Sequence, residues 1–312
     1  MNMIYSRNKG RFTFIIFIFI YFLSLNNLAF GNDPNSNNLN SAQTELGELQ
    51  KNFNGRLGIY AIDTNSQQTF AWNADKNFPI QSTMKLISVA NLLANSSKNT
   101  GLLNEKIYYT KNDLVFWHPI TGKFLSTGMS LRNLAKAAMI YSDNPAANLI
   151  TERLGGTTAL NVFAKSIGNE SFNILHDDGD LNSDPSSKED SSTPKDMAIS
   201  LQKILLSELL PVTTRQELIS WMMDSTTGYN RIRAGVPIGW TVAEKTGSGD
   251  TYGIANDIGI TWSPYCKPII LAIYSVQNQK LAKANENVVA SAAKIVMNKF
   301  SKQDKCFDEM YK

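Results

Sequence analysis

The sequence predicts an α/β fold in which a helical domain is inserted into a sheet-containing domain that the two ends of the chain complete. Two observations predict this fold. Segments with the alternating apolar pattern of strands occur near the start of the chain and return only in its last quarter. Segments with helical periodicity fill the stretch between them. A chain of 312 residues has room for one large domain or for two that pack closely together.

The beginning of the chain has the features of a cleaved signal peptide. Arg7, Lys9 and Arg11 form a basic start, an apolar stretch covers residues 12–25, and small residues precede a cleavage site after Gly31. A membrane anchor is the alternative, but a span needs ~20 apolar residues and this stretch is shorter. We therefore expect a periplasmic protein that has no stable association with the membrane after cleavage.

The composition limits the kinds of ligand. Without residues 1–31 the chain carries equal numbers of basic and acidic residues, so no charge excess favours nucleic acid or a membrane surface. His118 and His176 are the only histidines, and no Cys/His cluster has metal-ligand spacing, so we expect neither a metal nor another cofactor. Cys266 and Cys306 permit one disulfide in an oxidising compartment, and two buried thiols are the alternative.

The predicted segments follow one another in the order that an inserted domain requires. Residues 32–43 are rich in Asn and Ser and are expected to form a flexible mature N-terminus. Residues 44–74 and 226–303 are assigned to the α/β domain, and residues 75–225 to an all-α domain. Residues 304–312 form a C-terminal tail.

Within the α/β domain, a helix over residues 44–53 precedes two strands, and three further strands precede a closing helix. The five strands are predicted over residues 56–63, 68–72, 240–246, 254–262 and 268–276, and the closing helix over residues 282–300. The inserted helices are predicted over residues 82–93, 131–141, 146–154, 158–167, 193–206 and 214–223. Thr193-Pro194 is a strong helix start, because a capping residue precedes a proline. The polar segment 172–192 lacks periodicity, and loops that long are usually functional or disordered.

Three short motifs carry the chemistry. The first places Ser82 and Lys85 at the start of a predicted helix, where positions i and i+3 share a face. A hydroxyl needs a neighbouring base to become a nucleophile, and a lysine with a lowered pKa can serve. The free N–H groups of a helix N-terminus can also hold a developing oxyanion. The second motif is Ser-Asp-Asn at 142–144, and the third is Lys-Thr-Gly at 245–247.

Each motif alone is common, but the three in this order and spacing match the signature elements of penicillin-recognising serine enzymes. About residues 44–303 resemble a class A serine β-lactamase, and supporting segments lie at residues 116–119, 226–235 and 256–257. The resemblance implies a two-domain serine β-lactamase/transpeptidase-like fold, with an antiparallel five-stranded sheet flanked by helices. It also implies hydrolysis of β-lactam antibiotics, namely penicillins and also cephalosporins, through a covalent acyl-enzyme.

The resemblance assigns roles to the motif residues. Ser82 is the implied nucleophile, and its N–H and that of Ser248 form the implied oxyanion hole. Lys85 accepts or relays the proton of Ser82, and Ser142 passes a proton to the departing β-lactam nitrogen. Asn144 is implied to hold the amide of the substrate side chain.

The substrate carboxylate is expected to bind along the Lys-Thr-Gly strand. The residues implied in this contact are Lys245, Thr246, Gly247 and Ser248. In some relatives an Arg from the preceding loop assists, and Arg231 aligns with it, although a structural salt bridge is the alternative. Arg233 is expected to have a structural partner. Trp117 is expected to stack on substrate at the rim of the site, with ordinary surface packing as the alternative.

The long loop departs from the family pattern. The family carries Glu-Pro-x-Leu-Asn there, and its Glu activates the water that hydrolyses the acyl-enzyme. Here Leu181 and Asn182 align with the end of that element, which puts Asp178 at the base position and Asn182 beside it as a partner on the water. Asp is a methylene shorter than Glu, and a shift of about an ångström can cost on the order of 10²-fold in rate. A solvated acidic loop is the alternative to this base assignment.

Two neighbours of Asp178 also differ from the family. Gly179 stands where the family has Pro. His176 stands where the family has an Arg that pairs with an Asp at the far end of the loop, here Asp190. Because a His–Asp pair loses its charge above the His pKa, the loop is expected to be looser at neutral pH. These changes concern deacylation rather than acylation.

Two other functions share the three motifs. A D,D-peptidase would act on peptidoglycan stem peptides, but it has no need of a loop that carries Asp178. A sensor that acylates with β-lactams and hardly deacylates is supported only by Asp in place of Glu. Gln81 and Gly249 occupy the places of two cysteines that some carbapenem-hydrolysing relatives join, so carbapenem hydrolysis is not expected. We expect a monomer whose partner is a small-molecule β-lactam.

Overall fold

The computed structural model of the chain describes residues 34–264 and 266–302. Residues from Pro34 onward belong to one compact unit, so the predicted boundaries at 74/75 and 225/226 stay predictions. The predicted signal peptide (1–31), the predicted tail (304–312) and Cys306 lie outside the described residues. Cys266 is disulfide-bonded. None of the helices in the described residues is long and apolar enough to cross a membrane.

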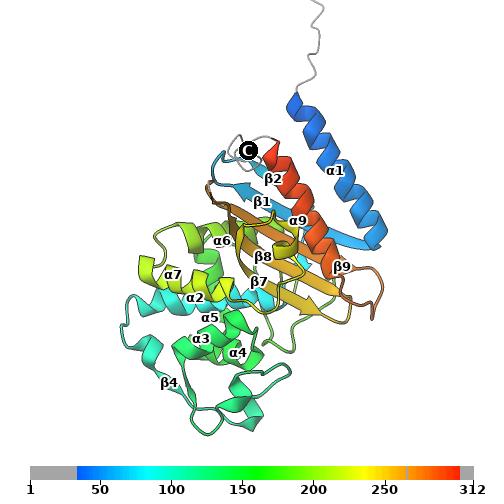
Figure 1. Cartoon of the computed structure of the whole chain (residues 1–312). Coiled ribbons are helices and arrows are strands. Elements are labelled where there is room, and N and C mark those ends of the chain that lie inside the picture. The colour runs from blue at the N-terminus through cyan, green and yellow to red at the C-terminus, as the bar shows by residue number, and fades with distance from the viewer. Residues whose placement is uncertain (1–33, 265, 303–312) are drawn as a thin grey trace, which may run out of the picture. The chain divides into compact units, whose positions relative to one another are not determined.

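A five-stranded antiparallel sheet forms the centre of the α/β part, as predicted (Figure 1). Its strands are β1 (Gly55–Asp63), β2 (Thr69–Trp72), β7 (Thr241–Gly249), β8 (Ile254–Trp262) and β9 (Ile269–Gln277). Their order in the sheet is β2-β1-β9-β8-β7, so β1, from the start of the chain, pairs directly with β9, the last strand. All four neighbouring pairs are antiparallel. The two ends of the chain therefore complete one sheet, which places β7 at its edge.

Successive side chains of a strand point to opposite faces of the sheet, and in this sheet both faces are covered. In β9, Ile269, Leu271 and Ile273 belong to a core shared with α1 and α9, whereas Ile270 and Ala272 belong to the core of the inserted helices. Helix α1 (Pro34–Phe53) and helix α9 (Glu286–Ser301) cover the first face. Because both faces are covered, β8 and β9 are buried almost throughout instead of alternating between buried and exposed residues.

The predicted flexible N-terminus at residues 32–43 is wrong from Pro34 onward, because the first helix begins there rather than at residue 44. Pro34 suits the first helical position, since its fixed φ matches the helix and its missing N–H would have no partner. Ala42 and Leu46 are both buried against the sheet core, so the apolar stripe extends beyond the predicted start. The Asn- and Ser-rich composition concealed this continuation of the helix.

The inserted part is helical, as the pattern predicted. Its helices are α2 (Lys85–Ser96), α3 (Leu131–Ile140), α4 (Asn144–Arg153), α5 (Gly156–Ser166), α6 (Pro194–Leu206) and α7 (Val212–Met223), and the short α8 (Ile232–Gly235) follows them. Short 3₁₀ turns are η1 (Gln81–Met84), η2 (Leu102–Asn104), η3 (Lys111–Asp113) and η4 (Thr121–Lys123). Two small ladders pair β3 (Phe78–Pro79) with β6 (Ser191–Ser192) and β4 (Lys106–Ile107) with β5 (Met129–Ser130). Thr193 caps α6 by accepting a hydrogen bond from the Asp196 N–H, which confirms the predicted helix start.

The loop over residues 172–192 is held at its base by a buried carboxylate. Asp190 Oδ1 accepts the N–H groups of Leu175 and His176, at 2.8 and 3.1 Å. Asp190 Oδ2 accepts the N–H of Asn182 at 2.8 Å and contacts His176 Nδ1 at 2.7 Å. The predicted pairing of His176 with Asp190 is therefore confirmed. Gly179 has a φ of +112°, which favours glycine and explains why this position does not carry the family's proline.

The His176–Asp190 pair predicts a pH-dependent contribution to stability. The hydrogen bond and the charge of Asp190 raise the pKa of His176. Stabilisation is therefore complete below about pH 6.5, the ordinary His pKa, and is lost as the pH rises through the raised value in the folded protein. We expect the difference in unfolding free energy between the parent and His176→Ala to shrink from about pH 5 to about pH 9 in urea titrations. His118→Ala is the matched control, because the His118 ring contacts a backbone carbonyl oxygen rather than a carboxylate. A difference that stays constant over this range would contradict a charged pair.

Candidate active site

The first two catalytic candidates lie where the sheet edge meets the inserted helices. Ser82 belongs to the 3₁₀ turn η1, and Lys85 is the first residue of α2. Lys85 Nζ lies 2.7 Å from Ser82 Oγ, so the predicted i, i+3 contact is formed. The turn η1 packs against β7 at Gly247, where a Cβ would come within 2.9 Å of the Ile80 carbonyl oxygen. Glycine at this position therefore allows the strand to approach the nucleophile closely.

Lys85 is completely buried and its amine is surrounded by oxygen atoms. Besides Ser82, its Nζ contacts Ser142 O at 2.9 Å, Ser142 Oγ at 3.3 Å, Asn144 Oδ1 at 2.6 Å and Asp178 Oδ2 at 2.7 Å. Burial lowers the pKa of Lys85, and the carboxylate of Asp178 opposes that shift. An ammonium has three hydrogens for these five oxygens, so it cannot donate to all of them at once. Such an amine is suited to moving a proton between them.

The Ser-Asp-Asn motif forms a tight loop before α4. Ser142 has a φ of +58°, which is uncommon for a residue that is not glycine. Asp143 caps α4 by accepting the Ala146 N–H, and its carboxylate also accepts the N–H groups of Ile120 and Thr121. The motif thus fixes the neighbouring segment 116–121 as well as its own serine.

The second half of this loop leads to the rim of the site. Asn144 donates from its side chain to Phe116 O at 2.8 Å and from its backbone to Trp117 O at 3.0 Å. Trp117 is about half exposed (49%), and its Nε1 donates to Tyr141 O at 2.9 Å. The exposed indole therefore lies beside the residue before Ser142, as expected for a rim position.

Strand β7 carries the third motif to the other side of Ser142. Lys245 is fully buried, and its Nζ donates to Ser142 Oγ and to Thr246 O, both at 2.9 Å. Burial lowers the pKa of Lys245 well below its usual value, and the positive charge of Lys85 lowers it further. Ser142 Oγ thus lies between two lysine amines. The hydroxyls of Thr246 and Thr227 lie 2.6 Å apart. Thr227 falls within the supporting segment 226–235, but the sequence assigned it no role of its own.

Arg231 is buried beside β7, and its guanidinium is saturated with acceptors. Its Nε and Nη2 contact Glu286, and Nη2 also donates to Ser248 Oγ at 2.6 Å. Its Nη1 donates to Gly247 O and Asn256 O. The structural salt bridge named as the alternative is therefore formed, and the link to Ser248 accompanies it. All of its donor hydrogens are engaged.

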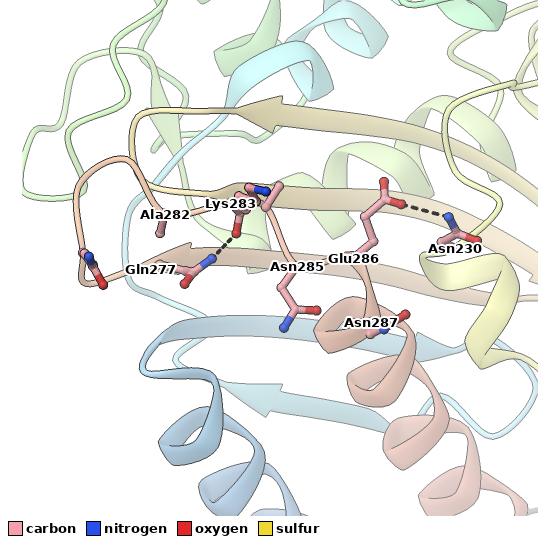
Figure 2. A pocket seen from close by; sticks show the side chains of 9 residues that line it. Asn230, Gln277, Ala282, Lys283, Asn285, Glu286 and Asn287 are labelled. Atoms are coloured by element: carbon pink, nitrogen blue, oxygen red, sulfur yellow. Dashed lines mark hydrogen bonds between the residues drawn. The ribbon is translucent and has the colours of Figure 1, made fainter.

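Glu286 also borders a polar pocket that is distinct from the motif residues. In Figure 2 it reaches across to Asn230, whose Nδ2 donates to Glu286 Oε2 at 3.1 Å. The other labelled residues come mainly from the segment that leads into α9. The lining of this pocket includes none of the predicted catalytic residues.

Beneath β7, Arg233 contacts Glu244 at 2.9 Å, which confirms that Arg233 has a structural partner. Burial and the nearby carboxylate of Asp257 raise the pKa of Glu244. Asp257 also accepts the Ile232 N–H at 3.0 Å. Gly228 leaves room for this buried carboxyl group, because a Cβ there would lie 2.1 Å from Glu244 Oε1.

Asp178 reaches the catalytic cluster in spite of its short side chain. It is 4% exposed, and its Oδ2 lies 2.7 Å from Lys85 Nζ. Its backbone N–H donates to Asn148 Oδ1 at 2.8 Å, and Asn148 Nδ2 donates back to Asp178 O at 3.0 Å. Asn148 lies one helical turn after Asn144 on α4, a spacing that could have indicated it. The structure therefore disfavours a freely solvated acidic loop at Asp178.

Asn182 lies in the same loop as Asp178, and its predicted role as a partner on the water stays a prediction. Its side chain accepts the Asp184 N–H at 2.8 Å and donates to Glu189 O at 3.4 Å, both within the loop. No hydrogen bond joins Asn182 to Asp178, two residues that the structure describes. The side-chain amide of Asn182 thus helps to shape the loop.

Together these groups form a cluster that is suited to proton transfer. A nucleophilic hydroxyl, a second hydroxyl, two buried amines and a carboxylate are joined by contacts of 2.7 to 3.3 Å. Within the residues that the structure describes, no group of His, Cys, Asp or Glu side chains is placed to hold a metal ion. The arrangement can transfer an acyl group to Ser82 and return it to water.

Most of the chain is similar to known β-lactamases in sequence and in structure. Residues 41–300 match the model of the beta-lactamase enzyme family. The chain is 41% identical to the carbapenem-hydrolysing β-lactamase KPC of Klebsiella oxytoca, over 80% of this chain and 86% of that protein. It is 42% identical to β-lactamase 3 of Bacillus cereus, over 83% and 81% of the two chains. A crystal structure of a β-lactamase from Desulfarculus baarsii superposes with a TM-score of 0.82 at 39% identity, covering 83% of this chain and 97% of that one.

The match extends over the sheet, the inserted helices and all three motifs. The chain belongs to the class A serine β-lactamases, hydrolases that open the cyclic amide of β-lactam antibiotics.

Proposed function

We propose that this enzyme hydrolyses penicillins and cephalosporins through an acyl-enzyme on Ser82, and that water activated by Asp178 releases the product. One observation carries the proposal. The amine of Lys85 lies 2.7 Å from Ser82 Oγ and 2.7 Å from Asp178 Oδ2, so the nucleophile and the deacylating base share one proton relay. The alternative peptidase has no use for that second contact.

Acylation begins when Ser82 Oγ attacks the β-lactam carbonyl and its proton passes to Lys85, which relays it within the cluster. The N–H groups of Ser82 and Ser248 are proposed to hold the oxyanion. When the ring C–N bond breaks, the nitrogen takes a proton from Ser142 Oγ. Ser142 is replenished through Lys85 or Lys245, whose amines lie 3.3 and 2.9 Å from its oxygen.

Deacylation consumes one water molecule. Asp178 takes a proton from this water, the hydroxide attacks the ester carbonyl, and the bond to Ser82 Oγ breaks. Ser82 then recovers a proton through Lys85, which restores the resting state. Burial of Asp178 keeps its carboxylate directed at the cluster rather than at bulk solvent, which offsets the loss of a methylene.

Substrate binding is proposed to use both sides of the cluster. Asn144 keeps one amide hydrogen free for the carbonyl of the substrate side chain, because the other is given to Phe116 O. Lys245, Thr246 and Ser248 bind the substrate carboxylate. Arg231 acts on it through Ser248, because donation to Ser248 Oγ leaves the serine hydrogen free for the carboxylate. Trp117 stacks on the substrate at the rim.

We further propose that the mature enzyme is a periplasmic monomer without stable membrane association. The basic, apolar and small-residue pattern of residues 1–31 supports export. The balanced charge of the remaining chain gives no attraction to an anionic membrane surface. A stalled β-lactam sensor is the second candidate function, supported by Asp178 in place of Glu.

The overall proposal is tested with penicillin and the purified chain from Asn32 to Lys312. We expect many turnovers per enzyme, because the base and the nucleophile are joined through Lys85. Ser82→Ala should abolish both turnover and covalent labelling, as measured by absorbance and intact-protein mass spectrometry. A burst of one equivalent followed by silence would favour the sensor instead.

The Asp178 assignment predicts a specific defect in deacylation. Asp178→Asn should lower kcat on the order of 10³-fold, because a general base is lost while the nucleophile remains. Acyl-enzyme should then accumulate and be visible by mass spectrometry. Asp177→Asn is the matched control, because Asp177 is the exposed neighbour in the same loop. An Asp178→Asn variant that turns over at the parental rate would place the base elsewhere.

The proposed contact between Ser248 and the substrate carboxylate predicts a binding defect that depends on the substrate. Ser248→Ala should raise KM for a penicillin about tenfold with a smaller change in kcat, because a charge-assisted hydrogen bond is lost. The same variant should treat the methyl ester of that penicillin as the parent does. An equal effect on the acid and the ester would show that Ser248 does not contact the carboxylate.

A further inference from the structure

Gln81, the residue before the nucleophile, is tied to the long loop by both hydrogens of its side-chain amide. Its Nε2 donates to Asn182 O at 3.1 Å and to Ser183 Oγ at 3.2 Å. The side chain is 7% exposed, so these bonds are shielded from water. Gln81 and its acceptors are about a hundred residues apart in sequence, so this contact is set by the fold rather than by local structure.

The position of Gln81 is restricted on two sides. Its φ is +50°, a left-handed conformation that an ordinary residue adopts only where the surroundings enforce it. At the end of β7, a Cβ on Gly249 would meet Gln81 Cδ at 3.2 Å and Oε1 at 3.3 Å. The carboxamide therefore lies between the end of the strand and the loop, with little room to move away from either.

The other anchors of this loop come from different directions. The carboxylate of Asp190 accepts backbone N–H groups at the base of the loop, and Asn148 on α4 accepts the N–H of Asp178. Arg56 donates to Pro185 O. Gln81 supplies the link to the turn that carries Ser82. The segment between the Asp178 and Gln81 contacts is only a few residues long, so a shift at Ser183 reaches the carboxylate.

We propose that Gln81 is a positioning residue for deacylation: it fastens the loop that carries Asp178 to the turn of the nucleophile, and so sets the distance between base and ester. This inference rests on the proposed role of Asp178. Asp is shorter than the family's Glu, so the distance from its carboxylate to the ester depends more strongly on the position of the loop. Acylation depends on Ser82 and Lys85, which η1 and α2 hold without the loop.

The test compares Gln81→Met with the parent in single-turnover and steady-state reactions on one penicillin. Met keeps the unbranched length of Gln and removes both donors. We expect the deacylation rate constant to fall about tenfold, because a small displacement of the base is costly. Acylation should change by less than about twofold, so kcat and KM should fall together.

Gln67→Met is the matched control. Gln67 also has a positive φ (+61°) and donates its side-chain amide to a nearby carbonyl, Thr64 O, but it lies in the turn between β1 and β2. This variant should leave both rate constants unchanged. Ser183→Ala removes one of the two acceptors and should slow deacylation about threefold, so it keeps the proposal testable if Gln81→Met folds poorly.

A double variant separates positioning from other effects. If Gln81 acts through Asp178, Gln81→Met should not further lengthen the acyl-enzyme lifetime of Asp178→Asn. The proposal is overturned if Gln81→Met lowers acylation and deacylation equally, leaves both unchanged, or adds its full effect to Asp178→Asn. A parent that acylates without turnover would instead overturn the proposed function, which keeps the two failures distinct.

Discussion

A fully buried lysine amine holds the catalytic site together. Removing an ammonium from water is expensive unless oxygen atoms replace its hydration, and Lys85 finds five of them within 3.3 Å. These oxygens come from the nucleophile turn, the Ser-Asp-Asn loop and the long loop. Three segments that are distant in sequence therefore meet at Lys85, because each of them supplies oxygen atoms that stabilise its buried charge. The same burial lowers the pKa of Lys85, which gives the amine the capacity to accept a proton.

The second buried lysine shows how charge is balanced in this site. Burial lowers the pKa of Lys245, and the positive charge of Lys85 lowers it further. Asp178 contacts Lys85, and Ser142 Oγ bridges the two amines. A substrate carboxylate arriving at β7 would add a negative charge where the site has an excess of cations. The buried positive charges of Lys85 and Lys245 thus favour both the binding of the substrate carboxylate and the proton transfers of catalysis.

The sequence predicted the sheet and the long helices because their apolar periodicity records burial. Ile269–Gln277 and Ile254–Trp262, for example, differ from the predicted strands by at most a residue at either end. It also predicted the contacts within motifs, such as Ser82 with Lys85, and the His176–Asp190 pair from a known family contact. Positions held by long-range contacts were not readable. The contacts of Thr227 and Gln81 become visible only when the chain folds, because hydrogen-bonding partners far apart in sequence leave no periodic pattern.

Several residues in and around the site have left-handed backbone conformations although they are not glycine. Gln81, Trp117 and Ser142 are among them, and Asp190 at the base of the loop is another. Such conformations cost of order 1–3 kcal/mol each and persist only because the surroundings enforce them. The working geometry of this enzyme therefore opposes its own thermodynamic stability. Substitutions that relaxed these backbone conformations would raise the free energy of unfolding and lower the catalytic rate. The fold is therefore less stable than this chain could be without its active site.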